Sequence, residues 1–384
     1  MNILFVCHNG IATNSGTHVS NIATALGKLG LDVVAAVPDD NLVTSRSPTT
    51  CKVISWSEAE IHRFADGGKA DFIHAWTPRQ HVARRTRSLA SLHDCNYLVH
   101  LEDNEYVVTS SQLGITPGDL MSRSQELKIP EMLADPEDMH EFIATSAGVT
   151  VLIKSLLEFK PSNLPGIEIW PSAEKEIFQP RAADTALRRS LAIPDDSKVV
   201  VYHGNVHAAN VEEVRSLYLA VAALARDGRR ITLVRLGEDY AELVTDSLKS
   251  VEAHVVRVAF QPRERLPDYL ALADLFVQPG RVDEFNIYRF PSKLPEFFAM
   301  GKPVIMPATN LGHALVHGQN AFLLRKGDGL EIANAMARIF DDEGLATVLG
   351  QGAKDFFDQN LSWDRSAAKL EKFYGNVSGM LGGW

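Results

Sequence analysis

Residues 198–237 read KVVVYHGNVHAANVEEVRSLYLAVAALARDGRRITLVRLG, and their pattern sets the architecture that we expect. An apolar run over 198–204 is followed by a helical pattern from about Val211 to Arg226, and then by a second apolar run over 231–237. Apolar runs without strict alternation, each followed by a helix, are typical of parallel strands buried on both faces. The stretch therefore predicts one strand–helix–strand unit of a parallel sheet.

The same alternation of apolar runs and helical patterns occurs in both halves of the chain. Further runs lie at 2–7, 31–37, 71–76 and 97–101, and at 254–260, 274–279, 302–307 and 321–324. Between the halves, 171–197 is more polar and carries three prolines, which is typical of a linker. We therefore expect an α/β chain of two Rossmann-like doubly wound domains, residues 1–172 and 173–360. A final helix over 361–384 has an apolar stripe and must dock on one of the two domains.

Composition excludes several classes of protein. The chain has 384 residues, a net charge of -10 and a pI near 5.7, which argues against nucleic acid as a partner. No apolar run approaches the roughly 20 residues of a membrane span. The N-terminal MNILFVCHNG reads as a strand rather than a signal peptide, and three widely spaced cysteines indicate no disulfide framework. A cytoplasmic protein is the simplest expectation.

A second informative stretch is YRFPSKLPEFFAMGKPVI, residues 288–305. Proline is tolerated only in the first turn of a helix, so Pro295 predicts a helix that begins near Pro291 or Ser292, with Ser292 as its N-cap. Lys293 and Glu296 then share one face of the first turn. A lysine at a helix N-terminus suits a diphosphate and a carboxylate suits ribose hydroxyls, although an ordinary Lys–Glu pair on a solvated helix fits the pattern equally well.

These residues resemble a known family, the retaining glycosyltransferases of the GT-B fold (family 4-like, "group 1"). The segment 274–304 is similar to the donor-site segment of that family. The positions that carry the resemblance are Asn286, Arg289, Pro291, Ser292, Lys293, Leu294 and Glu296, followed by Ala299, Gly301, Lys302, Pro303 and Val304. HGQNAFLL (317–324), the final helix and the opening glycine loop also resemble the family.

The resemblance implies a fold and a reaction. The second domain would bind a nucleotide diphosphate sugar, the first would bind a hydroxyl acceptor, and the final helix would cross back to the first domain. The sugar would be transferred with retention at the anomeric carbon. Glu296 would contact the ribose, while Lys293 and Arg289 would stabilise the leaving diphosphate. The remaining donor-binding positions would be Ser292, Asn286, Gly204, Asn205, Asn210 and Gly237. The sequence contains no D-x-D motif, so neither a metal nor another cofactor is expected.

Two departures from the family pattern concern the donor site. Tyr288 stands where many relatives carry an acid eight positions before the helix glutamate, and Asp283 or Glu284 is the substitute that we expect. Asn205 and Asn210 stand where relatives often have an arginine and a lysine that hold the diphosphate. This second departure is the main support for a rival interpretation, in which the protein is a non-catalytic GT-B protein that binds sugar nucleotides or a partner. A third interpretation is a sugar-nucleotide epimerase or a phosphorylase with the same fold.

In the first half, HLEDNE (100–105) places Glu102 and Asp103 where relatives often show His-Asp. Glu102 is expected to bond a sugar hydroxyl or to accept the acceptor's proton, and a solvated acidic loop is the alternative. Ser15, Gly16 and Thr17 precede the first helix and can present backbone N–H groups to a phosphate or to the acceptor.

A basic stretch in the first half comprises Arg79, Arg84, Arg85 and Arg87. It can contact a phosphate-bearing lipid acceptor or the inner face of a membrane, or it can be a solvated helix face. Peripheral membrane contact is therefore an open expectation. The sequence does not indicate an oligomeric state.

Overall fold

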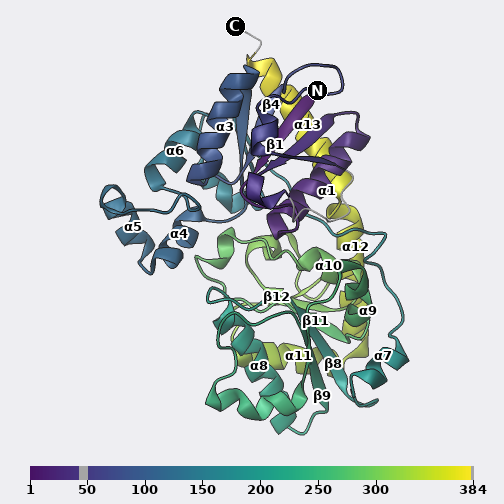
Figure 1. Ribbon diagram of the computed structural model, residues 1–384. Helices are drawn as coiled ribbons and strands as arrows, with labels where there is room; N and C mark the ends of the chain where they lie inside the picture. The colour runs from purple at the N-terminus through teal and green to yellow at the C-terminus, as the bar shows by residue number, and fades with distance from the viewer. Residues whose placement is uncertain (43–50, 382–384) are drawn as a thin grey trace. The chain divides into compact units, whose positions relative to one another are not determined.

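The computed structural model describes residues 1–42 and 51–381 and divides into two compact units (Figure 1). The first unit comprises Met1–Pro171, Tyr288–Phe290 and Trp363–Trp384, and the second comprises Ser172–Ile287 and Pro291–Ser362. Each unit is described by itself below.

The first unit is built on a seven-stranded parallel sheet of order β3-β2-β1-β4-β5-β6-β7. From β1 the chain first adds β2 and β3 on one side, and then crosses back to add β4 on the other side. The strand order therefore reverses between β1 and β4, and open α/β sheets bind ligands at the carboxyl ends of the strands at such a switch point. The strands are β1 (Asn2–Cys7), β2 (Asp32–Val37), β3 (Lys52–Ser55), β4 (Phe72–Trp76), β5 (Asn96–Leu101), β6 (Gly148–Val151) and β7 (Gly166–Glu168). The helices are α1 (Asn14–Lys28), α2 (Trp56–Ala59), α3 (Gln80–His93), α4 (Glu105–Leu113), α5 (Pro117–Arg123), α6 (Pro136–Ala144) and α13 (Trp363–Leu381).

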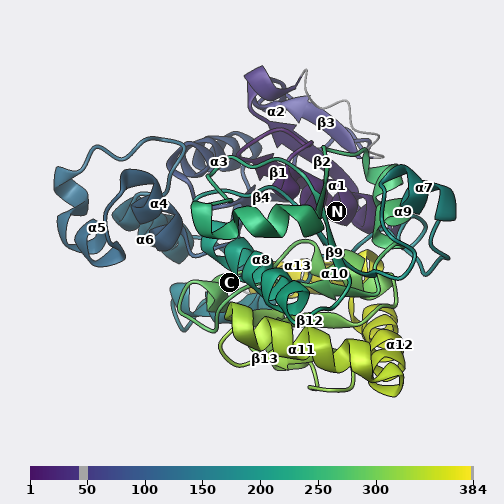
Figure 2. The same ribbon diagram turned by 90° about the horizontal axis from the view of Figure 1, so that it is seen from below.

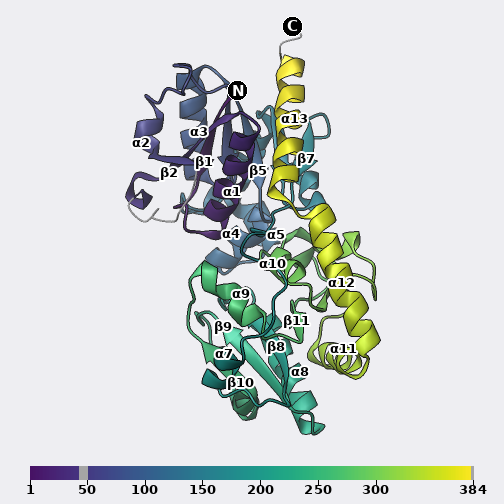
Figure 3. The ribbon, with the colours of Figure 1, turned by 90° about the vertical axis from the view of Figure 1, so that its right-hand side faces the viewer.

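The last helix, α13, is part of the core of the first unit. It packs beside α1 over the sheet, as Figure 3 shows. Its buried side chains, Ala367, Leu370, Phe373, Tyr374 and Val377, share one apolar cluster with residues of β1, β2 and α1. The apolar stripe that the sequence shows is therefore buried against the first unit, as the helical period requires.

The second unit is built on a six-stranded parallel sheet of order β10-β9-β8-β11-β12-β13. Here the strand order reverses beside β8, and α8 and α11 lie side by side (Figure 2). The strands are β8 (Lys198–His203), β9 (Ile231–Leu236), β10 (Val255–Val258), β11 (Leu275–Val277), β12 (Val304–Pro307) and β13 (Phe322–Leu324). The helices are α7 (Thr185–Ser190), α8 (Val211–Arg226), α9 (Leu266–Leu270), α10 (Leu294–Ala299), α11 (Gly329–Asp341) and α12 (Glu343–Asn360).

The predicted α/β class and the two doubly wound parallel sheets are confirmed. One local prediction is wrong: α10 begins at Leu294 with Lys293 as its N-cap, so Ser292 does not cap it. Pro295 is still in the first turn, because a proline there costs the helix no hydrogen bond. The linker segment also contains the short helix α7. No described helix is both long enough and apolar enough to cross a membrane.

A buried polar chain connects α13 to the sheet of the first unit. The Tyr374 hydroxyl lies 2.7 Å from His74 Nδ1, and His74 Nε2 lies 3.0 Å from Thr150 Oγ1. All three side chains are buried, and burial holds the pKa of His74 well below its usual value. The ring is therefore neutral, and each of its nitrogens has a hydrogen-bonding partner inside the core.

The variant Tyr374→Phe tests how much this chain contributes to the docking of α13. It leaves His74 Nδ1 buried without a partner, so we expect the free energy of unfolding to fall by about 1–3 kcal/mol. The measurement is the denaturation midpoint in urea. Tyr106→Phe is the matched control, since the Tyr106 hydroxyl belongs to a half-buried tyrosine of the same unit. Equal stabilities of the two variants would contradict the role given to the Tyr374 hydroxyl.

Candidate functional site

Two glycine loops meet at the carboxyl ends of β8 and β9 in the second unit. Gly204 and Gly237 have φ angles of +119° and +107°, which favour glycine. A Cβ atom on Gly237 would lie 2.9 Å from the carbonyl oxygen of Gly204. Neither position therefore accommodates a side chain, and the backbone at this edge of the sheet stays open to a ligand.

Lys293 lies against the first of these loops. Its Nζ is 4.9 Å from the centroid of the Tyr202 ring, on the neighbouring end of β8. A Cβ atom on Gly204 would lie 3.0 Å from Lys293 Cε. The structure thus brings together Lys293 and Gly204, which are far apart in the sequence, and places an ammonium group over a glycine loop at a strand's carboxyl end.

Glu296 has two partners that the sequence does not reveal. Arg263 Nη1 donates a hydrogen bond of 2.8 Å to Glu296 Oε1, and His203 Nε2 lies 2.7 Å from Oε2 in an ion-pair contact without good hydrogen-bond alignment. Arg263 also donates from Nε to Glu174, at 2.8 Å. Burial by itself would raise the pKa of Glu296, but His203 and Arg263 outweigh it and hold this pKa below its ordinary value.

Asn205 and Asn210 hold the loop that follows β8. Asn205 Oδ1 accepts a hydrogen bond of 3.0 Å from the backbone N–H of Glu238, and Asn210 Nδ2 donates to the Asn205 carbonyl at 3.1 Å. Asn210 Oδ1 accepts from the N–H of His207 at 2.8 Å. Both side chains therefore stabilise the loop itself, in place of the two cations that the family pattern has there.

The other predicted donor residues are placed differently. The side chain of Asn286 is buried and donates to Glu213 at 2.7 Å, while its backbone N–H donates to Asp283 at 2.9 Å. Asp283, one of the two expected substitutes for the missing acid, thus helps to shape the loop. Ser292 lies in the turn before α10, and Arg289 belongs to the short segment that groups with the first unit.

In the first unit, a buried carboxylate gathers three donors at the carboxyl ends of β4 and β5. Trp76 Nε1 donates to Glu102 Oε1 at 3.0 Å, and His18 Nδ1 lies 2.9 Å from the same oxygen. The Ser15 hydroxyl donates to Oε2. Burial alone would raise the pKa of Glu102, but the hydrogen bonds from His18 and Ser15 and the charge of His18 hold it far below its usual range.

Two further acids lie beside Glu102. Glu105 is buried and accepts from Arg79 Nε at 3.2 Å with both oxygens, and burial raises its pKa to about 7 despite that arginine. Burial also raises the pKa of Asp103, and the neighbouring charge of Glu102 adds to the effect. The alternative of a solvated acidic loop is therefore wrong for Glu102 and Glu105, which are both buried.

Of the predicted glycine loop, only Ser15 contacts Glu102 through its side chain. Gly16 is needed for space, because a Cβ atom there would lie 2.4 Å from Ile11 Cα. Thr13 is the N-cap of α1 and accepts from the N–H of Gly16 at 3.1 Å, and the Thr17 hydroxyl donates to the Thr13 carbonyl at 3.0 Å. Gly16 and Thr17 thus shape the start of the helix.

The basic stretch on α3 is neutralised by carboxylates of the first unit. The four ion pairs are Arg79–Glu105, Arg84–Glu131, Arg85–Glu60 and Arg87–Asp138. Partnered guanidinium groups are poor sites for a further anion, which favours the interpretation as an ordinary helix face.

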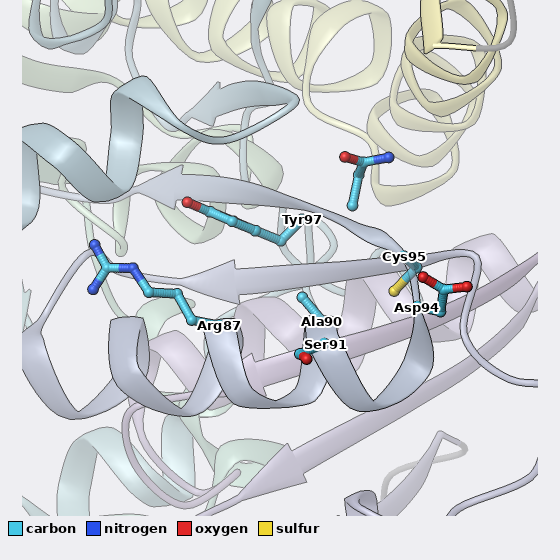
Figure 4. Close-up of a pocket in the computed structure, with 7 residues that line it drawn as sticks. Arg87, Ala90, Ser91, Asp94, Cys95 and Tyr97 are labelled. Atoms are coloured by element: carbon cyan, nitrogen blue, oxygen red, sulfur yellow. The ribbon is translucent and has the colours of Figure 1, made fainter.

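A surface pocket between α3 and β5 is a separate feature, shown in Figure 4. It is lined by Arg87, Ala90, Ser91, Asp94, Cys95, Asn96 and Tyr97. Because Asn96 and Tyr97 begin β5 whereas Glu102 follows its end, this pocket lies at the opposite edge of the sheet. Among residues 1–42 and 51–381, no cluster of three or more His, Cys, Asp or Glu side chains is arranged to hold a metal ion.

Sequence reasoning missed four residues that contact the predicted acids: His18, Trp76, His203 and Arg263. Two of them carried a positional signal. His203 is the last residue of β8 and immediately precedes Gly204, and Trp76 is the last residue of β4 in the first unit. Both therefore lie at the strand ends where a ligand is expected. His18 and Arg263 had no such signal, since they lie on a helix and in a short turn.

The partners of Glu296 make its contribution to stability depend on pH. Its pKa is lowered in the folded state, so the ionised form stabilises the fold above the unfolded pKa of about 4.5, and this stabilisation is lost as the pH falls further. At pH 7 we expect Glu296→Gln to lower the free energy of unfolding by roughly 1–3 kcal/mol. The difference from the wild type should shrink below about pH 4.5.

Denaturation midpoints from pH 3 to pH 8 measure this dependence. Glu264→Gln, an exposed acid beside Arg263, is the control and should behave as the wild type at every pH. A difference between Glu296→Gln and the wild type that stays constant over the range would contradict the ionised state of Glu296.

Comparisons with known proteins show what the second unit and the fold are similar to. The family model described as "Glycosyl transferases group 1" matches residues 197–342, which lie within the second unit. The D-inositol 3-phosphate glycosyltransferase of Thermobispora bispora is 26% identical over 215 residues, 53% of this chain and 49% of the relative. The alpha-D-kanosaminyltransferase of Streptomyces kanamyceticus is 26% identical over 227 residues, 57% of each chain. The chain thus spans about half the length of the curated relatives it matches.

Solved structures resemble almost the whole chain. HepE of Anabaena, in complex with UDP and glucose, has a TM-score of 0.69 at 15% identity and covers 98% of this chain and 99% of its own. Sucrose-phosphate synthase of Thermosynechococcus elongatus has a TM-score of 0.70 at 17% identity, with 99% and 100% covered. The chain therefore has the two-domain GT-B fold, and residues 197–342 in its second unit are similar to the group 1 glycosyl transferases.

Proposed function

We propose that this protein is a glycosyltransferase that moves a sugar from a nucleotide diphosphate sugar to a hydroxyl acceptor, with retention at the anomeric carbon. The observation that carries the proposal is the position of Lys293 over the Gly204 loop at the carboxyl end of β8. Open α/β sheets bind ligands at that edge, and an ammonium group there suits a diphosphate. The relatives with named activities are glycosyltransferases, which supports the same proposal.

Glu296 is the proposed ribose acceptor. A carboxylate offers about four lone-pair directions, so one contact from Arg263 and one from His203 leave each oxygen able to accept a ribose hydroxyl. Because Arg263 and His203 hold the pKa of Glu296 below its ordinary value, the carboxylate stays a strong acceptor even though it is buried. Arg263 and His203 would thus orient Glu296 toward the sugar nucleotide.

Lys293 is the proposed electrophilic group of the reaction. When the bond between the anomeric carbon and the diphosphate breaks, negative charge develops on the phosphate oxygens, and a fixed cation lowers the energy of that state. Asn205 and Asn210 supply no such charge, so Lys293 would bear most of it, with Arg289 as the second cation. In the absence of a D-x-D motif we propose that no metal takes part.

A second candidate function is that of a non-catalytic protein that binds a sugar nucleotide. It is favoured by the two asparagines, since both stabilise their own loop and neither adds charge to the site. The two candidates share the same binding site and differ in whether the bond to the diphosphate is cleaved.

Nucleotide binding is tested by thermal shift with UDP, GDP, ADP and CMP. We expect one nucleoside diphosphate to raise the melting temperature, since a ligand at 100 times its Kd stabilises by about 2.7 kcal/mol. Lys293→Ala should lose most of this shift because the diphosphate loses its cation. Lys326→Ala, an exposed lysine of the same unit, should keep it. No shift with any nucleotide would contradict the donor site.

Release of the nucleoside diphosphate from the matching nucleotide sugar then distinguishes the two candidates. An enzyme releases it, slowly with water and faster with an acceptor, whereas a passive binding protein shows the thermal shift and no release.

A further inference from the structure

The Lys293 ammonium has no carboxylate partner in the part of the chain that the structure describes. Glu296, three residues further on, is contacted by Arg263 and His203 instead, so the ordinary Lys–Glu pair of a solvated helix does not form. The charge of Lys293 is therefore left for a ligand. A lysine has a flexible four-carbon stem, however, and a cation stabilises an anion best when it is fixed in advance. Some other group has to hold this ammonium in place.

The Tyr202 ring is the group that the ammonium contacts. Lys293 Nζ lies over this ring, 4.9 Å from its centroid, which is within the range of about 6 Å for a cation–π contact. The ammonium also lies against the backbone of Gly204, since a Cβ atom there would be 3.3 Å from Nζ. Tyr202 and Gly204 are two residues apart at the end of β8, so one strand end supplies both contacts.

The Tyr202 ring is itself held firmly. Tyr202 is 1% exposed, and it pairs in register with Arg235 on the neighbouring strand β9. The ring belongs to the apolar cluster that also contains Val214, Leu217 and Tyr218 of α8. Because protein interiors are closely packed, a ring in this place has little freedom to move. Its position therefore defines where the ammonium lies.

A second cation contacts the same ring, but its charge is already balanced. Arg235 Cζ lies 5.3 Å from the centroid of the Tyr202 ring, and the Arg235 side chain is buried. Its Nη2 donates a hydrogen bond of 2.9 Å to Asp239. Of the two cations on this ring, Lys293 is thus the one whose charge remains for a ligand.

An aromatic ring holds a cation in a way that a carboxylate cannot. The ring attracts the ammonium through its quadrupole and carries no net charge, so the ammonium keeps its full charge. A carboxylate in the same place would neutralise the ammonium and would repel a diphosphate. This difference matters here, because Asn205 and Asn210 bring no charge to the site.

We propose that Tyr202 is a positioning residue of the donor site, whose buried ring holds the Lys293 ammonium beside the Gly204 loop and leaves its charge for the diphosphate. The inference rests on the proposed function and adds the residue that fixes its cation. Tyr202, Gly204 and Lys293 all belong to the second unit.

The variant Tyr202→Leu removes the ring and keeps an apolar side chain. A desolvated cation–π contact corresponds to about five- to thirtyfold in affinity. Isothermal titration calorimetry with UDP, GDP and ADP identifies the nucleotide that the wild type binds most tightly, and we expect its Kd to rise by about that factor in Tyr202→Leu. Tyr202→Phe keeps the aromatic face and should restore the Kd to within about twofold of the wild type.

Tyr218→Leu is the matched control. Tyr218 is buried in the same apolar cluster as Tyr202, so both leucine variants leave a cavity there and should lower the denaturation midpoint in urea. Weakened nucleotide binding is expected in Tyr202→Leu and not in Tyr218→Leu, which separates the contact with Lys293 from a general loss of stability.

A double-mutant cycle with Lys293→Ala tests whether Tyr202 acts through the lysine. If it does, Tyr202→Leu changes the Kd by less than about twofold once the ammonium is absent. NMR of protein labelled with ¹³C at the ε carbon of lysine gives a signature that needs no nucleotide. The Lys293 signal, identified by its absence in Lys293→Ala, should be shifted upfield by the ring in the wild type and in Tyr202→Phe, but not in Tyr202→Leu.

Three results overturn the proposal: equal Kd values in the wild type and Tyr202→Leu, equal weakening in Tyr202→Leu and Tyr218→Leu, or a full effect of Tyr202→Leu that persists without Lys293. A wild type that binds none of the three nucleotides contradicts the proposed donor site itself, and the inference then fails with it. Selective weakening in Tyr202→Leu, its rescue in Tyr202→Phe and the upfield Lys293 signal support the proposal.

Discussion

Parallel strand pairing is the constraint on which the arrangement of both candidate sites depends. When all strands of a sheet run in one direction, every carboxyl end and the loop after it lie at the same edge. In the second unit this edge holds Gly204, Gly237 and Lys293, and in the first it holds Thr77 and Glu102. Within each group the residues are far apart in the sequence. They come together because the strands that carry them run in the same direction.

Both units contain a buried carboxylate whose charge is stabilised by polar partners. Each buries a carboxylate that contacts a histidine at this edge, Glu102 in the first unit and Glu296 in the second, and a buried carboxylate without partners would become protonated. A histidine contacts each of them, and an arginine or a set of neutral donors completes the shell. The charge is thereby kept in a dry place, where it can orient a neighbouring group or a ligand with little competition from water.

Much of the fold could be predicted because its signals are local. The apolar period marks the strands and helices, so the bounds of α8 at Val211 and Arg226 agree with the pattern. Pro295 likewise restricts the start of α10, which lies two or three residues after the predicted start at Pro291 or Ser292. The error at Ser292 arises because capping depends on the backbone geometry of the turn, which the preceding loop sets and the residue type does not.

The candidate sites were predictable only in part. Lys293 and Glu296 stood out because two residues three apart on a helix share a face, whatever surrounds them. The basic stretch at α3 left two interpretations open, since four arginines in one segment fit either an anion site or an ordinary helix face until their carboxylate partners from other segments are known.

By itself, the sequence determined most of the strands and helices, the position of the glycine loops and the charged pair at the start of α10, but it did not indicate β3, β6, β7 or α7. The tertiary structure alone decided which groups meet: His18 with Glu102, 84 residues away, and Arg263 with Glu296, 33 residues away. The reason is physical. Periodicity and turn chemistry act between neighbours in the chain, whereas the pairing of a buried charge depends on which strands and helices lie beside each other in the folded sheet.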